Sequence, residues 1–350
     1  MFILRINKWI TTATIIFLLA LTGCSNKTVE TVKEDKDKKV EDVKKEEPEE
    51  FAAVYPLTGV GTNENINNRA IAVMVNNHPK ARPQSGLDKA DIVYELLAEG
   101  NVTRFLAIFQ SEKPDKIGPV RSAREYYIEL AKGYDGLFIA HGSSPDAQAM
   151  FDRGEIDHLN GMQYDGTLFK RSSDRVAPHN SYITYEKVLE GAKKNSYSME
   201  QPPSPIPFLT EAQQAELTGQ LGTNVTVPYL NNATFTSTYE YDAASGKYSR
   251  SSNGEQTVDY NSKEPVLLDN IFILETDHQV IDSSGRRQID LTSGGNAYLL
   301  QNGKVREVQW TNDNGRILPV IDGAVGGFIP GKTWINIVPS NPGLAAVTVN

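Results

Sequence analysis

Two arginines and a serine lie close together in residues 118–124, which read Gly-Pro-Val-Arg-Ser-Ala-Arg. The pattern from Ser122 to Glu125, Ser-Ala-Arg-Glu, is a capping box, and it predicts a helix that begins directly after Ser122. The first turn of a helix has free amide N–H groups and a partial positive charge. Arg121 and Arg124 add two guanidinium groups, which match a carboxylate or a phosphate in paired hydrogen bonds. The segment therefore predicts an anion-binding site, which Arg104 on the preceding strand could join.

The same arginines could instead be structural. Glu95 and Glu99 lie on the neighbouring predicted strand, where they could form ion pairs with the arginine side chains. In that case the positive charge is used within the fold, and none is left for a ligand. Both interpretations stay open at the level of the sequence.

A second group of polar residues, His141-Gly142-Ser143-Ser144, stands between a predicted strand and a predicted helix. The end of a strand that leads into a helix is a common ligand position in open sheets. His141 could serve there as a general base, and Ser143 as a nucleophile or an oxyanion donor. The sequence has no Gly-x-Ser-x-Gly pattern of a nucleophile elbow, so a hydrogen-bonded structural histidine is the alternative.

A third group lies in the loop over residues 171–180, which contains Arg171, Asp174, Arg175, His179 and Asn180 and little apolar surface. Loops on a rigid scaffold often carry recognition residues. Asp174 could equally neutralise one of the arginines, and Asn180 could cap the segment that follows. The five histidines of the sequence show no metal-ligand spacing, so we predict no metal and no cofactor.

These groups support two hypotheses about function. In the first, the protein is a non-enzymatic binder, and one groove takes an anionic or peptide-like ligand or an envelope protein. The candidate ligand-binding residues are then Arg82, Arg104, Arg121, Ser122, Arg124, His141, Ser143, Arg175, His179 and Asn180. In the second, it is a cell-envelope hydrolase with His141 or His179 as the base and Glu95 or Glu99 as the acid. The sequence does not decide between them, so no catalytic residue is assigned.

A further match, at residues 326–333, is better explained as a turn. The run Gly-Gly-Phe-Ile-Pro-Gly-Lys-Thr has the spacing of a phosphate-binding loop, which must be followed by a helix. Residues 333–339 alternate like a strand instead and end in proline. Pro330 also removes one amide donor from the loop.

Apolar runs and capping residues predict the elements around these groups. Buried strands are predicted over residues 70–75, 90–97, 102–109 and 137–140. The second and third are joined by Glu-Gly-Asn, which indicates a hairpin. Ser144-Pro145-Asp146 predicts the start of one helix, and another is predicted over residues 185–194.

The second half of the chain is dominated by strands. Residues 199–207 contain four prolines and predict a stiff connection, and a short helix capped by Thr210 follows within 209–217. Tight Asn-Gly turns then recur, residues 266–274 read as one long strand, and residues 297–300 and 305–310 form the clearest hairpin. The predicted fold class is α+β: a mixed, layered α/β domain over 51–198, a Pro-rich linker over 199–223 and a β-rich domain over 224–350.

The first 23 residues read as a lipoprotein signal peptide. A short positive region precedes an apolar run from Ile10 to Leu21, which is too short to span a bilayer comfortably. Thr22 and Gly23 then precede Cys24, the small-residue pattern of a bacterial lipobox. Residues 24–50 are rich in lysine and glutamate and lack aromatic residues, so we expect a lipidated Cys24 on a disordered, flexible tether. Two or more acyl chains anchor stably, which predicts the outer face of the bacterial cytoplasmic membrane.

The composition excludes several classes of partner and chemistry. Lysine plus arginine number 35 against 44 for aspartate plus glutamate, which gives a net charge of −9. An acidic chain gains no counterion-release energy on a phosphate backbone, so we expect no nucleic-acid partner. Because Cys24 is the one cysteine, an internal disulfide framework, a cysteine zinc cluster and a cysteine nucleophile in the body are ruled out.

Several longer motifs are similar to those of the YerB-type bacterial lipoproteins. They are Asn76-Asn77, residues 82–87, 90–95 and 103–105, the segment 118–124 and Ala177-Pro178-His179-Asn180, with the region 294–310 and residues 330–335 near the end. The resemblance covers nearly all of residues 51–339. It implies a two-part, lipid-anchored surface protein, and it implies no reaction, because the family has no assigned activity. Its motifs coincide with the three polar groups, which suggests that these groups share one groove.

We predict that replacing Cys24 with serine releases the protein from the membrane, because only a thiolate readily forms the thioether to the lipid. The measurement is cell fractionation followed by immunoblotting of the membrane and soluble fractions. Persistence of the Cys24→Ser variant in the membrane fraction would contradict the anchor.

Overall fold

The computed structural model describes residues 51–230 and 232–350. The predictions for the signal peptide, Cys24 and the tether therefore lie outside the described residues. Among the residues that are described, no helix is both long and apolar enough to cross a membrane.

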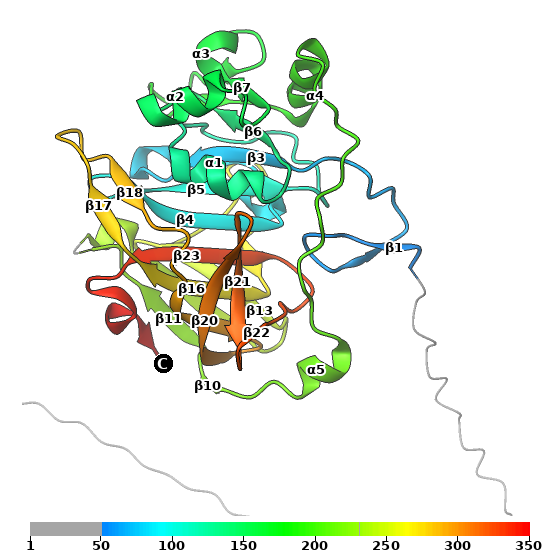
Figure 1. Ribbon diagram of the computed structural model, residues 1–350, viewed down its shortest axis with the longest axis vertical. Helices are drawn as coiled ribbons and strands as arrows, with labels where there is room; N and C mark the ends of the chain where they lie inside the picture. The colour runs from blue at the N-terminus through cyan, green and yellow to red at the C-terminus, as the bar shows by residue number, and fades with distance from the viewer. Residues whose placement is uncertain (1–50, 231) are drawn as a thin grey trace, which may run out of the picture. The chain divides into compact units, whose positions relative to one another are not determined.

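One sheet of twelve strands runs through both halves of the chain (Figure 1). Its order is β22-β21-β20-β19-β16-β23-β4-β5-β3-β6-β7, and β10 pairs with β20 beside this path. The first half supplies β3 (Ile71–Asn76), β4 (Ile92–Glu99), β5 (Val102–Phe109), β6 (Leu137–Ala140) and β7 (His158–Asn160). The second half supplies β10 (Gln220–Leu221), β16 (Asn270–Thr276), β19 (Gly295–Gln301), β20 (Lys304–Asp313), β21 (Arg316–Ile321), β22 (Ala324–Val325) and β23 (Thr333–Pro339).

The join between the halves is β23. This strand pairs in parallel with β16 on one side and with β4 on the other, so that Asn336 lies opposite both Ile273 and Glu95. All seven residues of β23 are buried, as expected for a central strand with both faces covered. The segments 51–198 and 224–350 therefore share one sheet within one compact unit, and neither segment has an apolar core of its own.

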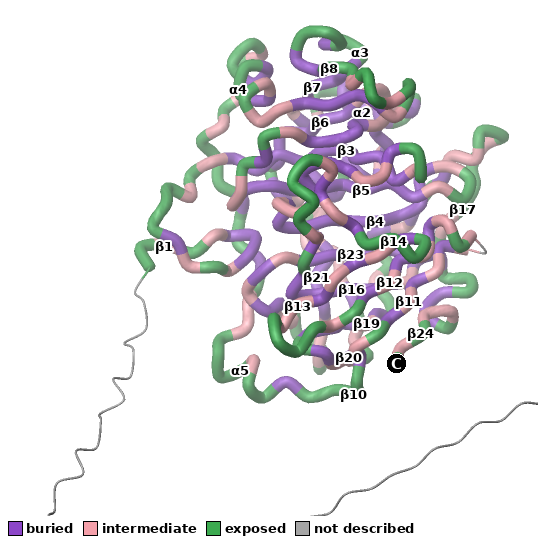
Figure 2. Tube along the Cα trace, turned by 180° about the vertical axis from the view of Figure 1, so that it is seen from behind, coloured by how far each residue is buried: buried purple, intermediate pink, exposed green. Residues whose placement is uncertain are grey.

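Each face of the sheet carries its own apolar core. On one face the first half packs against α1 (Glu125–Lys132) and α2 (Pro145–Asp152), through Tyr127 and Phe151 among others. The opposite face is covered by α4 (Tyr185–Lys194) and by a six-stranded sheet, which is seen from behind in Figure 2. That second sheet contains β11 (Asn224–Val227), β12 (Ser237–Asp242), β13 (Lys247–Ser252), β14 (Glu255–Gln256), β15 (Leu267–Leu268) and β24 (Thr348–Val349).

Shorter elements connect these layers. The strand pairs are β1 (Ala53–Val54) with β2 (Gly61–Thr62), β8 (Lys170–Arg171) with β9 (Ser181–Tyr182), and β17 (His278–Val280) with β18 (Arg287–Ile289). The remaining helices are α3 (Gly161–Tyr164) and α5 (Glu211–Ala215), with 3-10 turns at Pro79–Ala81, Leu87–Lys89, Ala233–Phe235 and Gly343–Ala346.

Most predicted elements are confirmed where local patterns specify them. The α+β class with a β-rich second half is confirmed, and so is the hairpin of β4 and β5. Ser144 caps α2 by accepting a hydrogen bond from the amide of Ala147, and α4 has the predicted bounds. The short helix α5 begins after Thr210 in a complete capping box.

The predicted start of α1 is wrong. The helix begins at Glu125 with Arg124 at the N-cap, and no side chain caps it. Ser122 donates its hydroxyl to the carbonyl of His141 at 3.0 Å instead. Residues 121–123 stay extended because they pair with neighbouring strands: the amide of Arg121 donates to Met74, and that of Ala123 donates to Gly142.

The predicted long strand over 266–274 is also divided. It changes sheets at Asp269, so that β15 belongs to the six-stranded sheet and β16 to the twelve-stranded one. The Asp269 carboxylate accepts a hydrogen bond from the amide of Lys332 at 2.8 Å and forms an ion pair with Lys247. These contacts hold the crossing residue between the two sheets.

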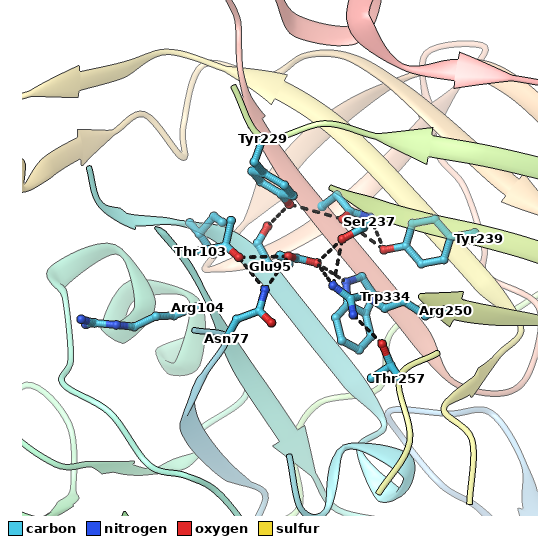
Figure 3. A network of polar contacts seen from close by, with 12 residues as sticks. Asn77, Glu95, Thr103, Arg104, Tyr229, Ser237, Tyr239, Arg250, Thr257 and Trp334 are labelled. Carbon is cyan, nitrogen blue, oxygen red and sulfur yellow. Dashed lines mark hydrogen bonds and ion pairs between the residues drawn. The ribbon is translucent and has the colours of Figure 1, made fainter. Parts of the chain in front are cut away.

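A charged network lies in the core between the sheets (Figure 3). Glu95 on β4 is fully buried, and its carboxylate accepts hydrogen bonds from Arg250 at 2.8 Å, Ser237 at 2.9 Å and Trp334 at 3.2 Å. Arg250 is also buried, and its guanidinium lies over the rings of Phe105 and Trp334. Burial by itself lowers the pKa of Arg250, but Glu95 and Tyr239 together outweigh this effect and the pKa is raised overall. Glu95 is therefore a structural partner of Arg250 from the second half of the chain.

We predict that Arg250→Met strongly destabilises the protein. The variant keeps the apolar stem but leaves the Glu95 charge buried without its cation, which costs about 3–5 kcal/mol of the free energy of unfolding. Urea denaturation followed by circular dichroism measures this loss.

Two further variants test the cause. Arg153→Met removes an arginine whose side chain is 60% exposed, and we expect it to change the urea midpoint little. Adding Glu95→Gln to Arg250→Met should recover part of the lost stability, because no buried charge then remains unpaired. A loss below about 1 kcal/mol for Arg250→Met would contradict the role of the pair.

Candidate anion-binding groove

A groove of about 580 Å³ lies where three parallel strands end. β3, β6 and β7 run in the same direction, so their carboxyl ends meet at one edge of the sheet. We call this hollow the arginine groove. Its polar lining consists of Arg121, Ser122, His141, Ser143, Gln148, Asn160 and Arg171, and its apolar rim includes Met162 and Pro178. One residue or more from each of the three polar groups of the sequence is thus present in the same hollow.

The backbone holds Arg121 between two strand ends. Its amide donates to the carbonyl of Met74 on β3 at 2.9 Å, and its carbonyl accepts from the amide of His141 after β6 at 3.0 Å. Within the described residues, however, its guanidinium makes no hydrogen bond or ion pair. Burial lowers the pKa of Arg121, the charge of Glu99 raises it, and Arg124 lowers it further. Because an arginine keeps its proton in proteins, Arg121 remains a cation that is partly removed from water.

The electrostatic character of the groove is positive. Arg121 and Arg171 line it, and none of its lining residues is an aspartate or a glutamate. Arg171 is partly neutralised, because Asp165 accepts a hydrogen bond from it at 2.9 Å. Arg121 is consequently the lining cation best placed to meet an anion.

Arg104 and Arg124 serve the fold. Both form ion pairs with the same carboxylate, that of Glu99, with Arg124 at 2.5 Å. Arg104 is almost completely buried and also donates to the carbonyl of Ser122 at 2.7 Å. The structural alternative therefore describes these two arginines, and neither lines the arginine groove.

Arg82 and Arg175 are likewise engaged within the protein. Arg82 donates to the side-chain oxygen of Asn77 at 3.0 Å and to the carbonyl of Thr234 at 2.9 Å. Arg175 donates to the carbonyls of Ala81 and Pro83. These two side chains fasten loops and lie outside the lining of the groove.

His141 is held on both ring nitrogens. Arg171 approaches Nε2 at 2.9 Å, and Ser181 lies 2.8 Å from Nδ1. A guanidinium can only donate, so Nε2 accepts and the proton is on Nδ1, which donates to Ser181. Burial and the nearby Arg171 lower the pKa of His141, so the ring is neutral near pH 7. Ser181 contacts the His141 ring but is buried and accepts a hydrogen bond from it, and Ser143 donates to Gln148 instead, so among the residues described His141 meets no accessible nucleophile.

His179 and Asn180 follow Pro178 in the loop and are not among the residues that line the groove. Asn76 donates to Nδ1 of His179 at 2.9 Å, and the ring of His179 stacks on His78 with the centroids 4.4 Å apart. Asn180 is nearly buried and accepts from Arg171 at 3.2 Å. With Glu95 in the core and Glu99 bound to two arginines, the acid and base of the hydrolase hypothesis are not assembled in the described residues.

Asn160 and Gln148 are the two polar groove residues that sequence reasoning missed, and Asn160 is the more firmly held. Its side-chain oxygen accepts from the amides of Gly142 at 2.9 Å and Met162 at 3.0 Å, which fixes its orientation. It ends β7, a strand of three residues whose sequence shows no alternating apolar pattern. Such a strand forms because it pairs with β6, so a local pattern carries no signal for it.

A larger hollow of about 820 Å³ lies between α1 and the strands β17 and β18. Its lining contains the carboxylates of Glu125, Glu129, Asp277 and Asp290 and no lysine, arginine or histidine. It would repel an anion. The smaller groove is therefore the candidate for the predicted anion binding.

Comparison with known proteins places the chain in a family. Residues 57–198 match the family described as "Protein of unknown function (DUF3048) N-terminal domain", and residues 225–335 match its C-terminal domain. Over 287 residues the chain is 50% identical to the "Putative lipoprotein YerB" of Bacillus subtilis (strain 168), covering 81% of this chain and 86% of that protein. A crystal structure of YerB from Bacillus subtilis is similar with a TM-score of 0.79 at 47% identity, over 85% of this chain and 99% of that one. The chain therefore belongs to the DUF3048 family, and the resemblance of its motifs to YerB-type lipoproteins is confirmed.

Proposed function

We propose that this lipoprotein is a non-enzymatic binding protein of the cell envelope and that it holds an anionic group at Arg121. A lipid on Cys24 would keep it at the outer face of the cytoplasmic membrane. The ligand would enter the arginine groove at the carboxyl ends of β3, β6 and β7.

The state of Arg121 carries this proposal. A partly buried cation loses hydration, and within the described residues no side chain forms a hydrogen bond or an ion pair with Arg121, on which the charge of Glu99 acts only from beyond ion-pair distance. An anion at this position would supply the missing interaction through charge-assisted hydrogen bonds. Asn160 also favours an anionic ligand. Two backbone amides donate hydrogen bonds to its side-chain oxygen, so its NH₂ group remains able to donate to a ligand.

The geometry favours binding over hydrolysis. A hydrolase needs a base within hydrogen-bond reach of a nucleophile or of the water that it activates. His141 instead has both nitrogens occupied, by Arg171 and by the buried Ser181. A binder needs only converging donors, and Arg121 and Asn160 supply them.

We predict that inorganic sulfate binds to the full chain, purified in detergent, and raises its melting temperature. Arg121→Ala should weaken sulfate binding roughly tenfold or more, because the loss of a charged hydrogen-bond partner costs about 1.5–3 kcal/mol. Isothermal titration calorimetry and thermal-shift measurements check both effects.

The control for net charge is Arg153→Ala, which removes an exposed arginine outside the groove and should leave the affinity unchanged. Without sulfate, Arg121→Ala should melt close to the wild-type temperature, since its guanidinium has no protein partner within the described residues. Equal sulfate affinity of Arg121→Ala and the wild type would refute the site.

We predict that sulfate binds more tightly as the pH falls. Burial lowers the pKa of His78, His141 and His179, and the charge of Arg121 contributes to lowering each of them. A bound anion offsets that charge and raises the three pKa values, so binding takes up protons. Affinity should therefore increase from about pH 7.5 to about pH 5.5, across the ordinary histidine range, in which sulfate stays fully ionised.

Calorimetry in buffers of different ionisation enthalpy measures the proton uptake directly. Release of protons on binding, or a lower affinity at the lower pH, would show that the histidines do not respond to the anion.

A further inference from the structure

The arginine groove continues into a second hollow of about 460 Å³. The two share Gln148, Asn160 and Met162, so a ligand that fills one reaches the other without leaving the surface. Beyond the shared residues, the second hollow is lined by Asp152, His158, Gln163, Asn195 and Tyr197. We call it the amide groove, because four of its lining side chains are asparagine or glutamine.

The amide side chains are held in place by the protein. Gln148 accepts from Ser143 at 2.9 Å and donates to Asp152 at 2.8 Å. Asn195 accepts from Tyr164 at 3.0 Å and donates to the carbonyl of Gly191 at 2.8 Å. Because each of these contacts uses one donor or one acceptor, both amides keep a further N–H and a further lone pair for a ligand.

The other two amides add to this set. Asn160 keeps the two N–H groups of its amide, since both of its internal contacts are made by the oxygen. Gln163 is exposed, and its side chain makes no hydrogen bond within the described residues. The amide groove thus offers donors and acceptors side by side, and the fold holds three of the four amides, those of Gln148, Asn160 and Asn195, through hydrogen bonds.

This lining matches hydroxyl groups better than it matches the side chains of a peptide. A hydroxyl is both a donor and an acceptor, and so is each amide. Peptide recognition instead uses pockets for apolar side chains, whereas Met162 is the one large aliphatic residue of the amide groove, and it is 74% exposed. The single acid, Asp152, also disfavours a second negative charge in this part.

We propose that the two hollows form one site for a glycan that carries its negative charge on a terminal sugar. The acidic sugar occupies the arginine groove with its carboxylate or phosphate on Arg121, and neutral sugars lie along the amide groove. This inference rests on the proposed function, because it assigns the Arg121 contact to the acidic end of the ligand. Each hollow is of the size that holds a small organic molecule, so the pair has room for more than one sugar.

The test measures calorimetric affinities of the full chain for two trisaccharides, 3′-sialyllactose and glucuronosyl-xylobiose. Each should bind at least about tenfold more tightly than its acidic monosaccharide, because the neutral sugars add hydrogen bonds to the amide groove. Lactose and xylobiose, which lack the acid, should bind more weakly than the trisaccharides.

Variants separate the two parts of the site. Gln163→Ala should weaken trisaccharide binding several-fold and leave sulfate affinity unchanged, whereas Arg121→Ala weakens both. Gln201→Ala, at an exposed glutamine outside both hollows, is the matched control and should change neither affinity.

Two outcomes would overturn the glycan assignment while leaving the proposed function intact. One is sulfate binding at Arg121 with equal affinities for the trisaccharides and their acidic monosaccharides. The other is an acidic peptide of similar length, N-acetyl-Glu-Gly-Gly amide, that binds as tightly as the trisaccharides. If sulfate does not bind at all, the proposed function itself fails.

Discussion

The ion pair between Glu95 and Arg250 is the interaction on which the arrangement of the described chain depends. A buried carboxylate is costly unless a cation and further donors compensate it, and every one of these partners must arrive from elsewhere in the fold. Arg250 and Ser237 come from the six-stranded sheet, and Trp334 comes from β23. The charge on β4 can therefore be accommodated only when both halves of the chain have assembled around it.

The strand order links the Glu95–Arg250 pair to the arginine groove. β23 lies beside β4, and the last residue of β4, directly before the turn to β5, is Glu99. Glu99 takes the charges of Arg104 and Arg124, which leaves Arg121 of the same motif without a partner among the described residues. The segment 118–124 thus contains a structural arginine, Arg124, and one without a partner among the described residues, Arg121. The difference between them comes from the backbone pairing of residues 121–123 with β3 and with the residues that follow β6.

Local patterns predicted much of the fold and less of the site. The strands β3, β5 and β6 and the helices α2 and α4 follow from apolar runs and from caps within a few residues. The start of α1 did not follow, since the sheet contacts of residues 121–123 outweigh a capping box at Ser122. The partner of Glu95 could not be predicted, because Arg250 lies 155 residues from it in the chain, whereas the arginines that pair with Glu99 were among the candidates. Asn160 was missed, as its strand exists only through its pairing with β6.

The sequence alone determined the class of the protein: a lipobox before Cys24, an α+β body, and polar groups placed after predicted strands. These features are local, and each is written in neighbouring residues. The tertiary structure alone decided which arginine lacks a partner among the described residues, which nitrogen of His141 carries the proton, and that one sheet joins both halves. Those outcomes depend on which charges form ion pairs and which strands pair, between residues far apart in the chain. Such pairing depends on distance in space, so no periodic pattern along the sequence indicates it.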